Sequence, residues 1–134
     1  MLSNKLDVSD INSEILINSL SNYIKEKRCA YKDDNGERYT EFCSRKMIQD
    51  EFKKQGYSSN DIDNAITALE IDFNDQATNL ARAMIEVGRE YETYENSWVW
   101  DTSFIYNHFS DFGFTPEEIQ YAINNSGIKT ENLN

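Results

Sequence analysis

The sequence predicts a mainly α protein made of two helical repeats, each a long helix followed by a short helix–turn–helix. One small β-hairpin is expected in the first connector. The strongest evidence is a 20-residue pattern that starts at Met47 and recurs 57 residues later, at Phe104. Fixed-period self-similarity of this kind is the signature of repeat architectures. The two copies have six identical positions: Ile48/Ile105, Phe52/Phe109, Gly56/Gly113, Ile62/Ile119, Ala65/Ala122 and Ile66/Ile123.

The size of the chain predicts how these repeats are organised. A chain of 134 residues with 39% hydrophobic residues is long enough to bury a core. We therefore expect a single domain over residues 1–134, with repeat one at about 9–70 and repeat two at about 72–128.

In repeat one, caps at Asp7–Asp10 predict a long helix that runs to about Lys27. Its apolar residues recur at helical spacing: Ile11, Ile15, Leu16, Leu20, Tyr23 and Ile24. The connector at about 29–42 should form the hairpin, because Asn35-Gly36 is a turn pair that tolerates positive φ.

The helix pair of repeat one has clear start and stop residues. Ser44 can cap a helix to about Gln55, and Gly56 can supply its left-handed end. Ser58 can cap the next helix, with Asp61 in the capping-box position. The buried stripe of that helix is expected to be Ile62, Ala65, Ile66 and Leu69.

Repeat two follows the same order, with a long helix from about Asn74 to Arg89. Its buried face should contain Ala77, Leu80, Ala81, Met84, Ile85 and Gly88. The connector at 90–100 is either a second hairpin or a frayed extension of this helix. The expected caps and stops of the pair are Asp101, Gly113, Thr115 with Pro116 and Glu118, and Gly127.

The net charge of −11 is concentrated in one half of the chain. Ten basic and ten acidic residues precede Tyr57, whereas only Arg82, Arg89 and Lys129 oppose fourteen carboxylates after Gly56. Such a field favours basic partners and opposes nucleic acid, whose phosphates require Lys and Arg. The expected second helices of the two pairs contain no basic residue, so DNA reading by a helix–turn–helix is excluded.

The sequence contains no recognisable catalytic, metal or cofactor motif. Placing Gly36 at the sixth position of a calcium loop would put Tyr31 first and Phe42 twelfth, which excludes an EF-hand. Cys29 and Cys43 are expected to be reduced thiols, and His108 is the only histidine. We expect no enzyme activity and no cofactor, and the enzyme alternative would have to use these three residues.

The second connector is the best candidate for a protein-binding surface. Tyr and Trp dominate interface hot spots, and here they lie among carboxylates that would suit a basic partner. One of Trp98 and Trp100 is expected in the core and the other at the surface. The predicted partner-binding residues are Glu86, Glu90, Tyr91, Glu92, Tyr94, Glu95, Trp98, Asp111, Glu117 and Glu118.

The stretch from Ser44 to Ile128 resembles the host cell surface-exposed lipoprotein (Ltp) repeat family, in a cytosolic, unanchored form. The resemblance is based on four segments: Ser44-Arg45-Lys46-x-Ile48; Gly56-Tyr57-Ser58 with Ala65-Ile66; Asp72-Phe73-Asn74-Asp75-Gln76-Ala77 with Ala81; and Gly113-Phe114-Thr115-Pro116-Glu117-Glu118 with Tyr121-Ala122-Ile123. It implies a non-catalytic helical domain of phage and bacterial proteins. Some members of that family are prophage lipoproteins that block DNA entry by a second phage.

Together these observations predict a non-catalytic, acidic protein-binding module acting in the host cytoplasm. The leading hypothesis is a phage or mobile-element inhibitor of a host defence nuclease, of the anti-CRISPR kind, that blocks a basic nucleic-acid-binding surface. No direct nucleic-acid or membrane binding is expected. The alternative is a superinfection-exclusion module that binds a phage protein.

Overall fold

The fold is mainly α, as predicted. The computed structural model describes residues 8–26, 28–29 and 40–133. In these residues the elements are α1 (Val8–Glu26), β1 (Arg28–Cys29), β2 (Thr40–Glu41), α2 (Arg45–Lys54), α3 (Ser59–Ala68), α4 (Phe73–Arg89), β3 (Trp100–Asp101), α5 (Thr102–Phe112), α6 (Pro116–Ser126) and β4 (Thr130–Glu131).

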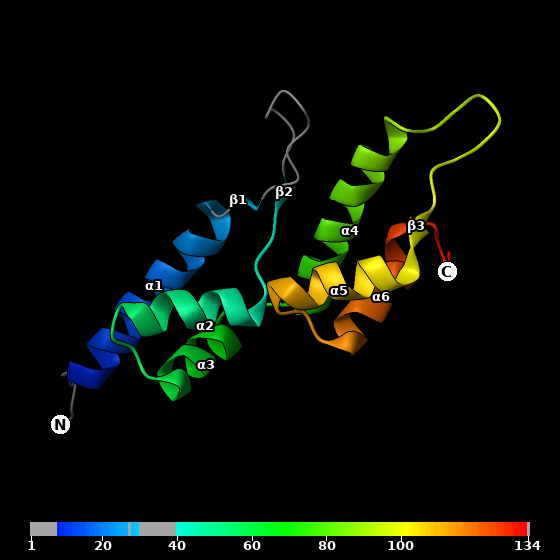
Figure 1. Cartoon of the computed structure of the whole chain (residues 1–134). Coiled ribbons are helices and arrows are strands. Elements are labelled where there is room, and N and C mark those ends of the chain that lie inside the picture. The colour runs from blue at the N-terminus through cyan, green and yellow to red at the C-terminus, as the bar shows by residue number, and fades with distance from the viewer. Residues whose placement is uncertain (1–7, 27, 30–39, 134) are drawn as a thin grey trace.

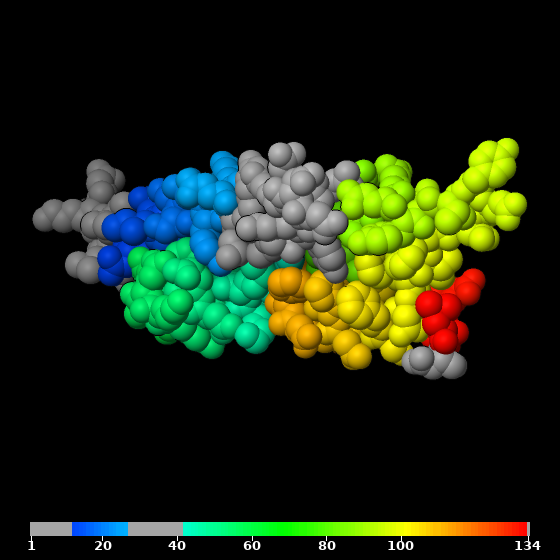
Figure 2. All heavy atoms as spheres, turned by 45° about the horizontal axis from the view of Figure 1, so that its top comes forward, coloured from blue at the N-terminus to red at the C-terminus, as the bar shows by residue number. Residues whose placement is uncertain are grey.

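The helices form two groups of three that lie end to end (Figure 1). In the first group α1 packs on α3, and in the second group α4 packs on α6. The space-filling view shows an elongated molecule, with the connector between α4 and β3 protruding at the end farthest from α1 (Figure 2).

The repeated residues are the core residues of the two groups. Four of the six identical pairs are buried on both sides, and a fifth is the glycine pair. The first core cluster contains Leu16, Leu20, Cys43, Ile48, Phe52, Ile62, Ala65, Ile66 and Phe73. The second contains Phe42, Ala77, Leu80, Ala81, Met84, Ile105, Phe109, Phe114, Ile119, Ala122 and Ile128.

The two clusters exchange one phenylalanine each. Phe42 precedes α2 but is buried in the second cluster, where its ring lies 5.0 Å from Phe112 between centroids. Phe73 opens α4 but is buried in the first cluster, with the Arg45 guanidinium 4.9 Å above its ring. The exchange joins the two groups through large apolar contacts.

The predicted helix stops and most of the caps are confirmed. Ser44, Ser58 and Thr115 accept hydrogen bonds from the third helical N–H, and Thr115 forms a full capping box with Glu118. At the ends of the second-repeat pair, Gly113 and Gly127 have φ of 102° and 86°. Gly56 has the same left-handed conformation, with φ of 100°.

One predicted cap is wrong. Asp101 occupies the N-cap position of α5, but its side chain makes no capping hydrogen bond. Its Oδ1 instead accepts from the backbone N–H of Leu133, at 3.1 Å. The carboxylate therefore holds the C-terminal segment rather than the start of its own helix.

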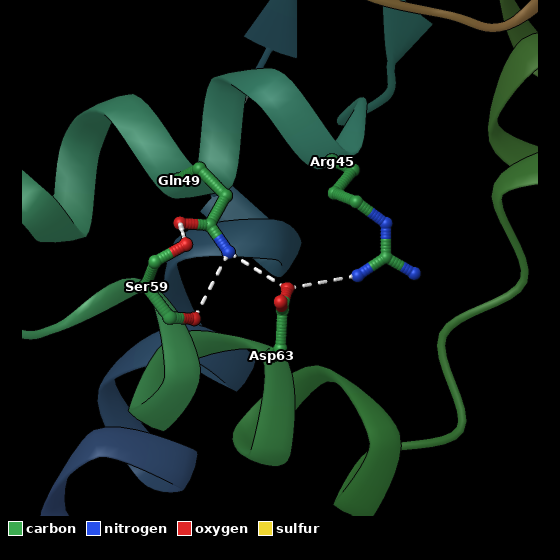
Figure 3. A network of polar contacts seen from close by, with 4 residues as sticks. All are labelled: Arg45, Gln49, Ser59 and Asp63. Atoms are coloured by element: carbon green, nitrogen blue, oxygen red, sulfur yellow. Dashed lines mark hydrogen bonds and ion pairs between the residues drawn. The ribbon is translucent and has the colours of Figure 1, made fainter.

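A polar clasp between paired helices also recurs at the repeat offset. In repeat one, Gln49 Nε2 donates to Asp63 Oδ1 at 2.7 Å, and Arg45 and Ser59 join the network (Figure 3). The residues 57 positions later are Tyr106 and Gln120, and the Tyr106 hydroxyl donates to Gln120 Oε1 at 2.6 Å. The repeats thus preserve a bond between the same two positions with different side chains.

The prediction for the first connector is confirmed at its strands, and the prediction for the second connector is wrong. β1 and β2 pair antiparallel, Arg28 with Glu41 and Cys29 with Thr40, as the base of the expected hairpin. Its turn, Asn35-Gly36, lies outside the described residues. The second connector is neither a hairpin nor a helix extension: it is a loop that leads into β3, and β3 pairs parallel with β4.

Candidate functional site

A row of aromatic rings runs from the second connector along α5, and we call it the aromatic strip. It comprises Tyr91, Trp98, Trp100, Phe104, His108 and Phe112. The last four are spaced four residues apart, which places Phe104, His108 and Phe112 on one face of α5. The strip begins in the second connector and ends against Phe42 at the junction of the two groups.

Each ring of the strip contacts the next. The centroid separations are 5.0 Å for Tyr91–Trp98, 5.7 Å for Trp98–Trp100 and 5.8 Å for Trp100–Phe104. Phe104 stacks on His108 at 5.4 Å, and His108 meets Phe112 edge-on at 5.1 Å. These distances lie in the favourable range for aromatic pairs, so each contact contributes to the stability of the strip.

The connector end of the strip is open to solvent. The exposed fractions are 55% for Tyr91, 38% for Trp98 and 45% for Phe104. Trp98, Trp100 and Phe104 line a shallow apolar hollow together with Val99, Asp101 and Leu133. As predicted, one tryptophan packs against the core and the other lies outside, and the structure assigns these places to Trp100 and Trp98 respectively.

Seven of the ten predicted partner-binding residues lie at the end of α4 and in the connector. Glu86 pairs with Arg89 on the exposed side of α4. Tyr91 and Trp98 join the strip, whereas Tyr94 is fully exposed. The other three, Glu90, Glu92 and Glu95, are exposed carboxylates of this region.

The remaining three predicted residues lie elsewhere. Asp111 is in the last turn of α5, while Glu117 and Glu118 are in the first turn of α6. Glu118 accepts a hydrogen bond from the Thr115 backbone N–H, so this carboxylate has a structural role. The connector leads through β3 into the start of α5, whereas Asp111 lies at the other end of this helix and Glu117 and Glu118 follow it in α6, so the structure does not gather all ten into one surface (Figure 1).

The sequence reasoning missed Trp100, Phe104 and Phe112 as members of the surface. A signal was present, because aromatic residues at four-residue spacing run through the connector into α5.

The described residues include two of the three side chains that the enzyme alternative would use, Cys43 and His108. The Cys43 side chain is fully buried in the first cluster, and its backbone N–H donates to Gln76 Oε1 at 2.7 Å. His108 belongs to the aromatic strip, and burial lowers the pKa of its imidazole against the opposing charge of Asp111. The Cys29 side chain lies outside the described part.

The described residues contain neither a candidate metal site nor a candidate membrane helix. Within residues 12–26 and 42–133, no three His, Cys, Asp or Glu side chains gather as they would around a metal ion. None of the helices in the described ranges combines the length and the apolar character needed to cross a membrane.

Comparison with protein-family models, with curated proteins and with solved structures gave no match. The resemblance to the Ltp repeat family therefore stays a prediction from the residues quoted above.

Proposed function

We propose that this chain is a non-catalytic protein-binding module whose partner is a basic, nucleic-acid-binding protein. The observation that supports this most is the combination of charge and exposed rings in one half of the molecule. After Gly56 the excess of carboxylates is eleven, and the same half exposes Tyr91, Tyr94, Trp98 and Phe104.

The two features have different physical roles in such a complex. Buried Tyr and Trp anchors supply most of the affinity at protein interfaces. Surrounding charges mainly raise the association rate and select partners of opposite sign. An apolar hollow at Trp98 and Trp100, with Glu90, Glu92 and Glu95 on the same connector, provides both an anchor site and an acidic surround.

The biological role that follows is inhibition by occupancy. A protein that covers a basic groove excludes the nucleic acid that normally binds there. We therefore propose a phage or mobile-element inhibitor acting in the host cytoplasm, with a defence nuclease of the CRISPR class as its target. No observation favours the superinfection-exclusion alternative over this one.

The proposal is tested with purified bacterial nucleic-acid-binding proteins, including a CRISPR nuclease, by measuring affinity at several salt concentrations. We expect a complex that weakens as salt rises and that displaces bound DNA or RNA from the partner. The test variant reverses three connector charges: Glu90→Lys, Glu92→Lys and Glu95→Lys.

A matched control reverses three charges in the first repeat and changes the net charge by the same amount: Glu14→Lys, Glu26→Lys and Glu51→Lys. We expect the connector variant to lose binding and the control variant to retain it. Equal losses would show that only net charge matters, and binding unaffected by salt would contradict the electrostatic part of the proposal.

A further inference from the structure

A second hollow shares two lining residues, Trp98 and Trp100, with the apolar one. It is formed by the end of α4, the second connector and the segment after α6, and its volume is about 220 Å³. Its lining residues are Ile85, Gly88, Arg89, Glu92, Trp98, Trp100, Gly127, Ile128 and Lys129. We call it the tryptophan hollow.

The charge of this hollow differs from that of the surrounding half. Only three basic residues follow Gly56, and two of them, Arg89 and Lys129, line the hollow. Glu92 is the one carboxylate of the lining, so the lining is net positive in a half whose net charge is −11. Arg89 pairs with Glu86 through one nitrogen, and a guanidinium has five N–H donors in total.

Two of the lining residues, Trp98 and Trp100, are the only tryptophans of the chain. Their rings are 5.7 Å apart at an interplanar angle of 80°, and they form a corner. Gly88 allows this corner to sit close to α4, because a Cβ at that position would lie 2.7 Å from Trp98 Cδ1. The glycine therefore fits the close approach of the indole.

The size of the hollow limits what it could hold. Pockets for drug-sized ligands measure about 300–1,000 Å³, so this smaller hollow suits the single aromatic ring system of a small ligand. Indole faces attract flat rings, while Arg and Lys side chains bind carboxylates and phosphates. Salt screens the more distant carboxylates, because the Debye length is about 8 Å at physiological salt, and Glu92 and the Arg89-paired Glu86 are the acidic groups that an anion would meet at the site itself.

We propose that the tryptophan hollow binds a small ligand that contains one aromatic ring system and one anionic group. The ring lies against Trp98 and Trp100, and the anionic group contacts Arg89 and Lys129. The same chemistry has two sources, a mononucleotide and an aromatic amino acid with a carboxylate. The site needs no protein partner, so it goes beyond the proposed inhibitor function.

The two tryptophans make the test direct, since both line the site and no others contribute to the emission. The probes are adenosine monophosphate and N-acetylphenylalanine, titrated at physiological salt with excitation at the red edge of tryptophan absorption. Adenosine and N-acetylphenylalanine amide serve as the neutral counterparts. We expect a saturable change in emission with at least one anionic probe, and binding of its neutral counterpart about tenfold weaker, the effect of about 1.4 kcal/mol.

Lys129→Gln and Arg82→Gln are the matched variants. Each removes one positive charge from the same half, but Arg82 does not line the hollow. We expect Lys129→Gln to weaken binding about tenfold, the effect of losing about 1.4 kcal/mol, and Arg82→Gln to leave it unchanged. The Lys129 side chain is not needed for the strand pairing, because Trp100 N–H bonds to the Lys129 backbone carbonyl.

The outcomes are distinct. Binding of adenosine monophosphate alone identifies the nucleotide source, and binding of N-acetylphenylalanine alone identifies the carboxylate source. The proposal is overturned by the absence of a saturable change with both anions, by equal binding of the neutral analogues, or by equal losses in the two variants. None of these results bears on the binding of a basic protein partner, which is measured separately.

Discussion

Gly56 and Gly113 are equivalent positions of the two repeats, and replacing each by alanine separates backbone strain from packing. Both have left-handed φ, 100° and 102°, so the intrinsic conformational cost should be the same. Their surroundings differ. A Cβ at Gly56 would meet nothing within 4 Å, whereas a Cβ at Gly113 would overlap Lys46 Cβ and lie 3.0 Å from Ser44 Oγ.

The expected magnitudes follow from these contacts. Gly56→Ala should lower the free energy of unfolding by about 1 kcal/mol, the usual cost of a left-handed conformation for an L-residue. Gly113→Ala should add an overpacking cost of about 1–3 kcal/mol. Lys46 Cβ is fixed to the α2 backbone and cannot rotate away, so the start of α2 would have to shift from the end of α5.

Urea unfolding monitored by circular dichroism gives both free energies, and an unchanged m-value shows that the two variants unfold the same structure. The difference between the variants measures the packing contribution at the junction. Equal losses at Gly56 and Gly113 would refute the inference that α2 and the α5–α6 turn are in close contact.

Three further predictions concern substitutions of single residues. Ser44→Ala should lower the free energy of unfolding by about 2–3 kcal/mol, because it removes the α2 cap and also the hydrogen bond donated to the Phe112 carbonyl. Ser58→Ala removes a cap alone and should lower it by about 1 kcal/mol. Equal losses in urea unfolding would contradict this difference. Gly88→Ala should push Trp98 outward and shift tryptophan emission to the red, and an unchanged spectrum would show that the indole does not pack on α4. Burial lowers the pKa of His108 in the folded state, so the unfolded state binds this proton first as the pH falls. The free energy of unfolding should therefore decrease as the pH falls below 6.5, the pKa of an unperturbed histidine, towards the lower pKa of the folded state. His108→Phe should flatten the dependence of unfolding free energy on pH in that window, and a slope identical to that of the parent protein would assign it to other groups.

The sequence was most informative where local chemistry decides the structure. Ser44, Ser58, Thr115 and the glycines act within three or four residues of themselves, so their roles as caps and stops could be read directly. Helical spacing likewise identified the buried face of α4.

The failures share a different cause, which is contact between distant segments. Asp101 was expected to cap its own helix, but Leu133, 32 residues away, donates to it. The second connector was expected to form a hairpin or to extend α4. Instead β3 pairs with β4 from the C-terminal end, and Trp98 packs on Gly88. A local sequence pattern cannot predict either of these contacts, because each one joins segments that are far apart in the sequence.

The candidate site was predicted in part for the same reason. Tyr91 and Trp98 were identified because aromatic and acidic residues cluster in sequence, while Arg89 and Lys129 come together only through the fold. Charge alone groups Asp111 and Glu117 with the connector, but Asp111 lies in the last turn of α5 and Glu117 in the first turn of α6.

The exchange of Phe42 and Phe73 determines how the chain can be divided. Cutting the chain between α3 and α4 would give an N-terminal fragment in which Phe42 has lost its packing partners. The core of this fragment would also lack Phe73, which stays with α4. Removing a buried phenylalanine side chain typically costs about 3–5 kcal/mol, a large share of the stability of a small protein. Each fragment would lack one phenylalanine ring of its core, Phe73 in the first and Phe42 in the second. The two repeats are therefore mutually dependent and not interchangeable.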